Sequence, residues 1–505
     1  MSKARRVAIS YGPMTGGEAS VYSIYGMPPK YSMLMQNCHV SQRGGVEKIP
    51  GYVRCNDVSC ETNLTSGYEF RTTNGVRRIL AAGGGKIYEF NESEGSLVCI
   101  KDGLNQDAVV HFATFGDVCI ITNGVDAPLK YDGVQVTSLG GNPPSTAFKA
   151  HVHKGRVWMI ERNNTMLATC SALNDPEDYT GTTAGYIDFK YVLKSGDELV
   201  DVTTFNDLLV FFFRRHIAIY SGMTPAGDNA DFQLVQLIEG CGAYDTDLIK
   251  GYASDVVFVY DTGFKSLRQV VTTGSLTVGE VSQIIAPTIQ SEIASNAGNC
   301  AIVHYPAKSW LMTLINGKIW IYSYLWKAWG RMTGHKVYGM FDTIQGEVYL
   351  CGNGYLYRYG VGYSFDGEPI PMRWETAYAA FDKRGWSLGY PTHMELLLVP
   401  EAGGAINYCV KYDYDPEMII GSGTASLPSK THDIGVLDID SVAKWDEIDK
   451  LSGEEYVAVS SLSRRLVPLF GGGRAAQITI SNESVEGPLE INNLLIYAEI
   501  GIGGI

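Results

Sequence analysis

Residues 310–324 read WLMTLINGKIWIYSY, and this stretch decides the fold. A short apolar run leads into Asn316-Gly317, and a second run that carries aromatic side chains follows. Asn-Gly between two such runs predicts a β-hairpin, because both residues tolerate the positive φ of a type I′ turn. The stretch therefore predicts two antiparallel strands joined by a two-residue turn.

The same unit recurs along the chain, and two further copies also carry Asn-Gly, at 123–124 and 353–354. One residue marks each of the seven turns, and successive markers are 40, 40, 51, 48, 54 and 37 residues apart. The markers are Gly84, Gly124, Asn164, Arg215, Gly263, Gly317 and Gly354. The other copies are RRILAAGGGKIYEF (77–90), DVCIITNGVDAPLKY (117–131), RVWMIERNNTMLATCS (156–171), LLVFFFRRHIAIYSG (208–222), VVFVYDTGFKSL (256–267) and EVYLCGNGYLYRYG (347–360).

One strong hairpin in every ~40–50 residues is typical of the four-stranded blades of a β-propeller. A single blade cannot bury both of its faces, so blades stack, and closure of the ring protects the strand edges. The sequence thus predicts an all-β protein with a propeller of six to eight blades, about seven. A pair of β-sandwiches or an open β-solenoid remains an alternative.

One helix is expected, between the fifth and sixth hairpins at 275–299. Val281, Ile285, Ile289 and Ile293 follow one another at i, i+4 spacing and would line one helical face. Pro287 would either start a second helical segment or kink the first. This insertion accounts for the longest gap between hairpins.

The pattern changes after about residue 368, where longer alternating runs with wide loops begin. We therefore predict three parts: an N-terminal arm at 1–45, the propeller at 46–368, and a C-terminal domain at 369–505 that resembles a β-sandwich or barrel. An acidic insert at 433–455 interrupts the last part. Its carboxylates would form a solvated surface or line a channel, and they are Asp438, Asp440, Asp446, Glu447, Asp449, Glu454 and Glu455.

Composition limits the classes of function. The chain has 505 residues, a formal net charge of −14 and ten cysteines. Phosphate binding requires clustered Lys and Arg, so the charge disfavours a surface that grips nucleic acid, although DNA could slide past an acidic wall. The cysteines have no CxxC pair and are expected to be reduced thiols of a protein made in a cytoplasm. We expect neither a signal peptide nor membrane insertion.

The search for reactive motifs finds no GxSxG elbow and no HExxH helix. Gly83-Gly84-Gly85 before Lys86 lacks the second half of a phosphate loop, so a hairpin turn is favoured. His151 and His153 share one strand face and could hold a metal, but no third ligand is evident. We therefore expect no catalytic residue, no cofactor and no metal.

Two further sets of charged residues have ordinary structural interpretations. Asp413, Asp415 and Glu417 match no calcium loop and are expected to be turn residues. The paired arginines at 77–78, 214–215 and 464–465 lie in or beside predicted strands, where charged side chains protect edges.

Several segments, in order, resemble the nozzle or hub proteins of short-tailed bacteriophages, the packaged-DNA stabilisation type. The similarity lies in the order of the segments and in their general pattern of residue types rather than in an invariant motif. The segments are NCHVSQRGGVEKIPGYVR (37–54), TMLATCSALNDPEDYTGT (165–182), GDELVDVTTFNDLLVFFFRRHIAIYSG (196–222), EGCGAYDTDLIKGYASDVVFVYDTGFKSL (239–267), VGEVSQIIAPTIQSEI (278–293), RRLVPLFGGGRAAQITISNES (464–484) and PLEINNLLIYAEIGIGG (488–504).

The resemblance implies a structural virion protein without catalysis. It would form a ring of six copies in the tail, below the portal and the adaptor ring, after assembly in the host cytoplasm. The ring would line the channel through which double-stranded DNA leaves, hold the packaged genome and dock fibres or a tail tip. An acidic lumen would let DNA pass without adhering. Two alternatives are a propeller that binds a receptor or glycan and a propeller glycosidase or lyase.

Overall fold

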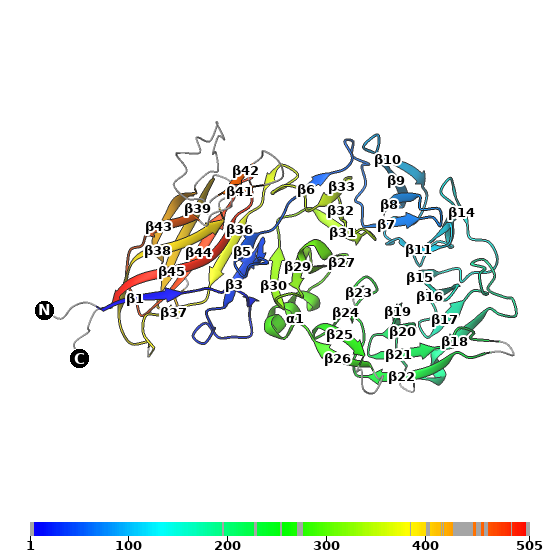
Figure 1. Ribbon diagram of the computed structural model, residues 1–505. Coiled ribbons are helices and arrows are strands. Elements are labelled where there is room, and N and C mark those ends of the chain that lie inside the picture. The colour runs from blue at the N-terminus through cyan, green and yellow to red at the C-terminus, as the bar shows by residue number, and fades with distance from the viewer. Residues whose placement is uncertain are drawn as a thin grey trace. The chain divides into compact units, whose positions relative to one another are not determined.

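All seven predicted hairpins are present in the computed structural model (Figure 1). It describes residues 5–500 except 194–195, 227–229, 253–254, 270–275, 384, 400–403, 416, 418, 428–447, 451–455, 459–462 and 486. The chain divides into two compact units. The β-sandwich unit comprises 1–53, 320–335 and 360–505, and the propeller unit comprises 54–319 and 336–359.

The propeller unit contains five complete four-stranded antiparallel sheets, counted over the described residues. In each, the predicted hairpin forms the second and third strands. They are β7 (Ser66–Arg71), β8 (Arg77–Gly83), β9 (Lys86–Asn91) and β10 (Ser96–Lys101); β11 (His111–Phe115), β12 (Val118–Thr122), β13 (Leu129–Tyr131) and β14 (Val136–Ser138); β15 (Ala147–His153), β16 (Arg156–Glu161), β17 (Leu167–Cys170) and β18 (Gly185–Asp188); β19 (Leu199–Phe205), β20 (Leu208–Phe213), β21 (His216–Ser221) and β22 (Gln233–Glu239); and β23 (Ile249–Tyr252), β24 (Asp255–Tyr260), β25 (Gly263–Gln269) and β26 (Leu276–Glu280).

Two further meanders complete the set of blades. In the sixth, β27 (Ala301–Tyr305) pairs with β28 (Trp310–Ile315), and β29 (Lys318–Ser323) follows. In the seventh, β31 (Val337–Asp342), β32 (Val348–Gly352) and β33 (Leu356–Tyr359) pair in sequence. Short 3₁₀ turns, η1 (Phe189–Tyr191) and η3 (Pro306–Lys308), connect strands of the third and sixth blades.

The ring of blades is closed. The first strands of successive blades contact one another in the order β7, β11, β15, β19, β23, β27, β31, and β31 contacts β7 (Figure 1). At the closure, Phe341 and Tyr349 of the seventh blade pack with Ile79 and Ala81 of the first. The chain thus forms a seven-bladed β-propeller, as the hairpin count predicts.

Apolar side chains between adjacent blades hold the ring together. Between the third and fourth blades, Trp158 packs against Phe211 with 5.7 Å between the ring centroids, and Phe189 packs against Phe211 at 5.0 Å. All three side chains are buried. Tight stacking explains why the middle strands, such as LLVFFF of β20, are apolar on both faces and give the strongest hairpin signal in the sequence.

The predicted helix is present but shorter than expected. After η2 (Gln283–Ile285), the helix α1 spans Ala286–Ala294, with Pro287 in its first turn. Proline is tolerated there because its missing N–H needs no partner at a helix start. Ile289 and Ile293 are buried as predicted, whereas Val281 precedes the helix because 276–280 form β26. It is the one α-helix in the described ranges.

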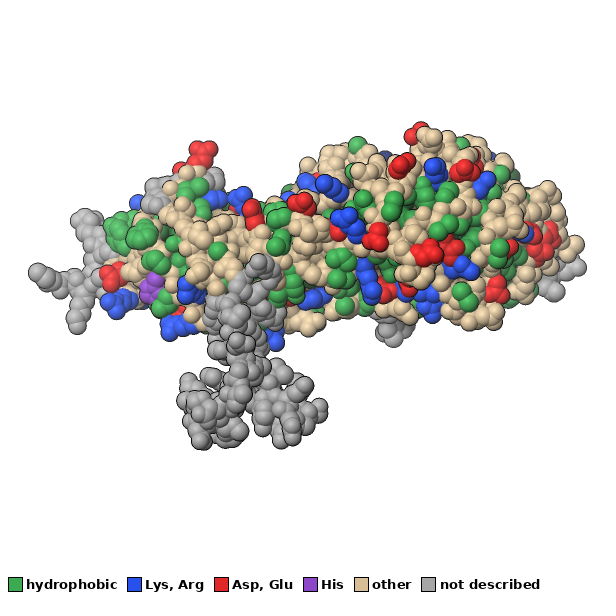
Figure 2. All heavy atoms as spheres, turned by 90° about the horizontal axis from the view of Figure 1, so that it is seen from above, with side chains coloured by type: hydrophobic (Ala, Val, Ile, Leu, Met, Phe, Trp, Pro, Cys, Tyr) green, Lys and Arg blue, Asp and Glu red, His purple; other side chains and the backbone are tan. Residues whose placement is uncertain are grey.

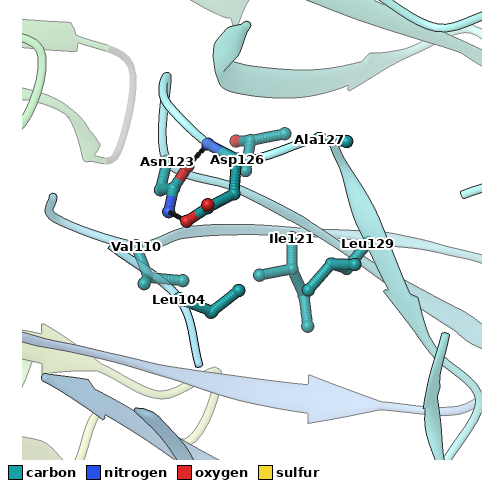
Figure 3. Close-up of a pocket in the computed structure, with 8 residues that line it drawn as sticks. Leu104, Val110, Ile121, Asn123, Asp126, Ala127 and Leu129 are labelled. Atoms are coloured by element: carbon teal, nitrogen blue, oxygen red, sulfur yellow. Dashed lines mark hydrogen bonds between the residues drawn. The ribbon is translucent and has the colours of Figure 1, made fainter. Parts of the chain in front are cut away.

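Only one of the three Asn-Gly pairs forms a two-residue turn. Asn316 and Gly317 have φ of 51° and 67° between β28 and β29. Asn123 instead begins a longer loop (Figure 3), where its Oδ1 accepts hydrogen bonds from the backbone N–H groups of Val125 and Asp126. Asn353-Gly354 also lies in a longer connection, from β32 to β33. The type I′ prediction for these two pairs was wrong, because asparagine also folds loops through its own side chain.

The glycine triplet forms the hairpin turn favoured by the sequence. Gly83 ends β8, Lys86 begins β9, and Gly84 and Gly85 have φ of 58° and 75°. A Cβ on Gly83 would lie 1.9 Å from the Asn63 carbonyl oxygen, so glycine is also required by packing.

The β-sandwich unit packs two sheets around one apolar core. One sheet has the order β4-β5-β45-β38-β43, with β1 against β45, and the other includes the path β30-β3-β36-β44-β39-β40, with β2 against β3 and β37 against β44. The bounds are β1 (Arg5–Ser10), β2 (Gly17–Glu18), β3 (Tyr31–Gln36), β4 (Cys38–Val40), β5 (Val46–Lys48), β30 (Ala328–Met332), β36 (Met372–Thr376), β37 (Ala379–Ala380), β38 (Gly389–Val399), β39 (Gly404–Tyr412), β40 (Ile419–Leu427), β43 (Ser463–Pro468), β44 (Ala475–Asn482) and β45 (Glu490–Ile500). Short strands β6 (Tyr52–Arg54), β34 (Ser364–Phe365), β35 (Glu368–Pro369), β41 (Ile448–Lys450) and β42 (Tyr456–Ala458) complete the set in the described ranges.

The division of the chain differs from the three predicted parts. Residues 1–45 are not a separate arm, because β1 pairs with β45 and β3 pairs with β36 inside the β-sandwich unit. Residues 320–335 also belong to that unit, although we expected them in the propeller. Sequence periodicity could not show this, because strand pairing between distant segments leaves no local pattern.

The acidic insert at 433–455 falls almost wholly outside the described residues. This applies to Asp438, Asp440, Asp446, Glu447, Glu454 and Glu455, while Asp449 lies in β41, for which only the backbone is described.

On the face shown in Figure 2, Lys and Arg side chains are interspersed with Asp and Glu. No helix within the described ranges is long and apolar enough to cross a membrane. All ten cysteines are free thiols.

Candidate functional site

The centre of the propeller holds a cavity of about 240 Å³. The first strand of a blade presents alternate side chains toward the axis, because residues i and i+2 share a face. These strands supply Ser66 and Tyr68 (β7), His111 (β11), Lys149 (β15) and Lys250 (β23), among other lining residues. This site, termed the central cavity below, is the natural place to look for chemistry in the propeller unit.

One hydrogen bond and two ion pairs link four successive blades beside the central cavity. The imidazole Nε2 of His111 lies 3.0 Å from Asp247 Oδ2, and the ammonium of Lys149 lies 3.1 Å from Asp247 Oδ1. Lys149 also lies 3.6 Å from Asp201 Oδ2 of the next blade. His111, Lys149, Asp201 and Asp247 form what we term the central network, which joins β11, β15, β19 and the segment before β23.

The central network sets the charge state of its members. Burial opposes ionisation of Asp247, but His111 and Lys149 hold the pKa of its carboxyl below the usual range. Burial raises the pKa of Asp201 to about 6, although Lys149 opposes the rise. The pKa of Lys149 is raised despite burial, because Asp201 and Asp247 stabilise its charged form. Two carboxylates thus share one ammonium at this point.

A second ion pair crosses the central cavity. Lys250 of β23 lies 2.5 Å from Asp342 of β31. The wall also contains Tyr68, whose hydroxyl lies 3.0 Å from the Thr114 hydroxyl and whose ring stacks on Phe112. Among the cavity-lining residues, Lys149 and Lys250 balance Asp247 and Asp342. Each of these carboxylates therefore has a cationic partner.

His151 and His153, the two histidines considered as metal ligands, do lie close together, and both contact the same hydroxyl group. His151 Nε2 lies 2.8 Å and His153 Nδ1 2.9 Å from the Thr204 Oγ1 of the neighbouring blade. Burial lowers the pKa of His151 to about 3 and that of His153 to about 4. Within the described ranges, no group of three or more His, Cys, Asp or Glu side chains could hold a metal ion.

The other charged candidates have partners within the chain. The Asp413 carboxylate accepts a hydrogen bond from the backbone N–H of Arg474, which is distant in the sequence, whereas Asp415 accepts one from the Glu417 backbone N–H at 2.9 Å and so serves a turn. Arg77 and Arg78 form ion pairs with Glu347 and Glu89, respectively. The remaining arginine contacts are Arg214 with Glu198, the Arg215 N–H with Asp197, Arg464 with Glu395, and Arg465 with the Ser426 hydroxyl.

A second cavity, shown in Figure 3, lies under the Asn123 loop between Leu104, Val110, Ile121 and Leu129. Its volume of about 10 Å³ is at the lower limit for one water molecule, which is ~10–15 Å³. It cannot hold a substrate.

Sequence reasoning did not find the central network. Lys149, Asp201 and Asp247 lie in or just before first strands, whereas the repeat was recognised from the second and third strands. Their only signal is a charged residue inside an otherwise apolar strand that precedes a hairpin, as in AFKAHVH (147–153) and LVDVTTF (199–205). Buried charges of this kind are rare unless they are paired.

Comparisons with known proteins show likeness in fold alone. No protein-family model matches the chain, and no curated protein matches it in sequence. Among solved structures, a streptogramin B lyase is similar at 14% identity over 61% of this chain and 96% of its own, with a TM-score of 0.42. The WD40 β-propeller domain of Doa1 is similar at 8% identity over 62% and 96% of the two chains, with a TM-score of 0.40. YCF48 from Cyanidioschyzon merolae is similar at 10% identity over 61% and 98%, with a TM-score of 0.41.

Proposed function

We propose that this chain is a structural protein of the tail of a short-tailed bacteriophage. It would assemble into a ring of six copies below the portal and adaptor, line the DNA exit channel and retain the packaged genome. The carrying observation is the central network, because it joins four blades by ion pairs and leaves the carboxylates of the propeller axis with cationic partners. A rigid propeller without a reactive centre suits a building block.

The order of the resembling segments supports the same proposal. They fall in both units: 196–222 and 239–267 span β19 to β25 of the propeller, and 464–484 and 488–504 span β43 to β45 of the β-sandwich unit. The resemblance covers most of residues 37–504 and therefore includes segments of both units. Fibres or a tail tip would dock on the assembled ring.

A glycosidase or lyase is less well supported. Most glycosidases require two carboxyl groups that face one substrate, one of them free to accept a proton or to attack, and a lyase requires a base that is free to take a proton. Asp201 and Asp247 instead share Lys149, and Asp342 is bound to Lys250.

The test is electron microscopy of tails isolated from virions, with this protein tagged. The proposal predicts a closed ring of tagged subunits below the portal. Tails that lack the protein, or that contain it without cyclic order, would contradict the proposal. Genes for a portal and an adaptor next to this gene would add independent support.

A further inference from the structure

The outer face of the β-sandwich unit carries a groove of about 360 Å³ that no part of the proposed function uses. It runs over β40, β39 and β44, and we term it the hydroxyl groove. Its side chains are short and polar, without a charged group or a large aliphatic one exposed in it. They are Asn407, Cys409, Ser422, Thr424, Thr479 and Ser481.

Strand register explains why these side chains gather. Asn407 pairs with Thr424 on one side and Ser481 on the other, and Cys409 likewise pairs with Ser422 and Thr479. Directly opposed residues point to the same face of the sheet, with Cβ atoms ~5 Å apart. Thr424, Asn407 and Ser481 therefore form one row of three polar side chains across the strands, and Ser422, Cys409 and Thr479 form a second row. The two rows are consecutive on that face because 407 and 409 differ by two.

The floor of the hydroxyl groove contains an unsatisfied hydroxyl. Thr479 is 8% exposed, and its Oγ1 has no hydrogen-bond partner within the described part of the chain. A buried hydroxyl without a partner costs free energy, and a ligand that forms a hydrogen bond with it would offset that cost. Ser422 and Thr424 are exposed at the rim, so a ligand can enter.

Both rows continue into polar groups on β36. Ser481 pairs with Arg373 and Thr479 pairs with Glu375. Arg373 and Glu375 are hydrogen-bonded at 2.9 Å, and Lys411 lies 3.9 Å from Glu375. Arg373, Lys411 and Glu375 together carry one net positive charge, whereas the residues that line the groove carry none.

Tyrosines lie at the end of β39 beyond Lys411. Tyr414 packs against Tyr378 with 5.0 Å between ring centroids and against Tyr25 at 4.5 Å. The Tyr378 hydroxyl is buried and also has no hydrogen-bond partner among the residues described. Burial raises the pKa of Tyr378 to about 12, with smaller contributions from Asp415, Glu375 and Cys409.

We propose that the hydroxyl groove binds a neutral saccharide. Hydroxyl and amide side chains both donate and accept hydrogen bonds, which matches the many hydroxyls of a sugar. Among the described residues, no charged side chain lines the groove, which disfavours phosphate or carboxylate ligands, and no aliphatic one does, which disfavours an apolar ligand. The volume is near the lower end of small-molecule sites, roughly 300–1,000 Å³, and suits a short oligosaccharide. This inference does not depend on the role in a phage tail.

The test is an array of neutral and anionic oligosaccharides probed with the full chain, followed by titration of each sugar retained. Ser422→Tyr places a ring in the groove at an exposed site and should weaken binding at least tenfold. Thr479→Val removes the buried hydroxyl and should weaken it several-fold. Thr392→Val, an exposed threonine of β38 on the other sheet, is the matched control and should bind as the wild type does.

Retention of neutral saccharides with this order of variants supports the proposal. Three results would overturn it: no saccharide is retained, only anionic saccharides are retained, or Ser422→Tyr binds as tightly as the wild type. Both variants are expected to fold, because Ser422 is exposed and Thr479→Val removes only a buried hydroxyl without a partner in the described part of the chain.

Discussion

Replacement of Lys149 by methionine is the sharpest perturbation of the propeller. The change keeps the length of the side chain but removes the ammonium that lies 3.1 Å from Asp247 and 3.6 Å from Asp201. Asp247 retains His111 at 3.0 Å, whereas Asp201, with 5% of its side chain exposed, loses the cation of the central network. The variant therefore leaves a buried carboxylate without its neutralising charge.

The magnitude follows from this loss. Breaking one side of a buried ion pair costs about 3–5 kcal/mol. Because Lys149 is partly exposed, we expect the lower end, about 3 kcal/mol at about pH 8. The pKa of Asp201 is already raised from 3.8 to about 6, which corresponds to roughly 3 kcal/mol at about 1.4 kcal/mol per unit.

The sign of the pH dependence can be worked out. A carboxyl whose folded pKa is raised stabilises the fold below its unfolded pKa, and this contribution is lost as the pH rises through the folded pKa. Without Lys149, which opposes the rise, the folded pKa of Asp201 increases further. Asp201 is then protonated at about pH 5, and the cost of Lys149→Met should fall to about 1 kcal/mol.

The assay is urea unfolding at about pH 5 and about pH 8. Hydrogen–deuterium exchange of peptides from β15 and β19 measures the stability of the propeller separately from that of the β-sandwich unit. The double variant Lys149→Met/Asp201→Asn is the control, and it should recover about 2 kcal/mol of the loss at the higher pH. An equal loss at both pH values, or a double variant no more stable than the single one, would refute the interpretation of the central network.

Two further predictions concern other buried polar groups. Arg156 is 1% exposed and donates hydrogen bonds to the backbone carbonyls of Met223, Ser171 and Thr183. Arg156→Leu should therefore lower the free energy of unfolding, measured by urea unfolding, by about 3 kcal/mol or more. A loss below ~1 kcal/mol would contradict this role. Thr479→Val should instead raise the stability by about 1 kcal/mol, because it removes a buried hydroxyl without a partner, and a lower melting temperature than that of the wild type would show that this hydroxyl stabilises the free protein.

The sequence predicts the propeller well because its signal is local. Each blade contains a hairpin with two largely apolar strands, and in four of the seven the turn has two residues, as in Leu208–Phe213, Arg214-Arg215 and His216–Ser221. Both strands lie between neighbouring blades, so burial imposes the apolar pattern directly on the sequence. The first and fourth strands are shorter or more polar, and they were not recognised.

The β-sandwich unit and the two sites are less predictable, for a different reason. β1 pairs with β45, and Arg5 lies opposite Ile500, so the sheet is formed by residues from the two ends of the chain. The central network and the hydroxyl groove likewise depend on strand register. A serine at 481 and an asparagine at 407 carry no pattern until the sheet places them side by side.

The central claim is the place of this protein in an assembly, and cryo-electron microscopy of intact virions tests it most directly. The account predicts density for the propeller and the β-sandwich unit repeated around the tail axis, as a closed ring below the portal and adaptor. Virions in which this chain is absent, or in which it occurs only as isolated copies away from the DNA channel, would contradict it.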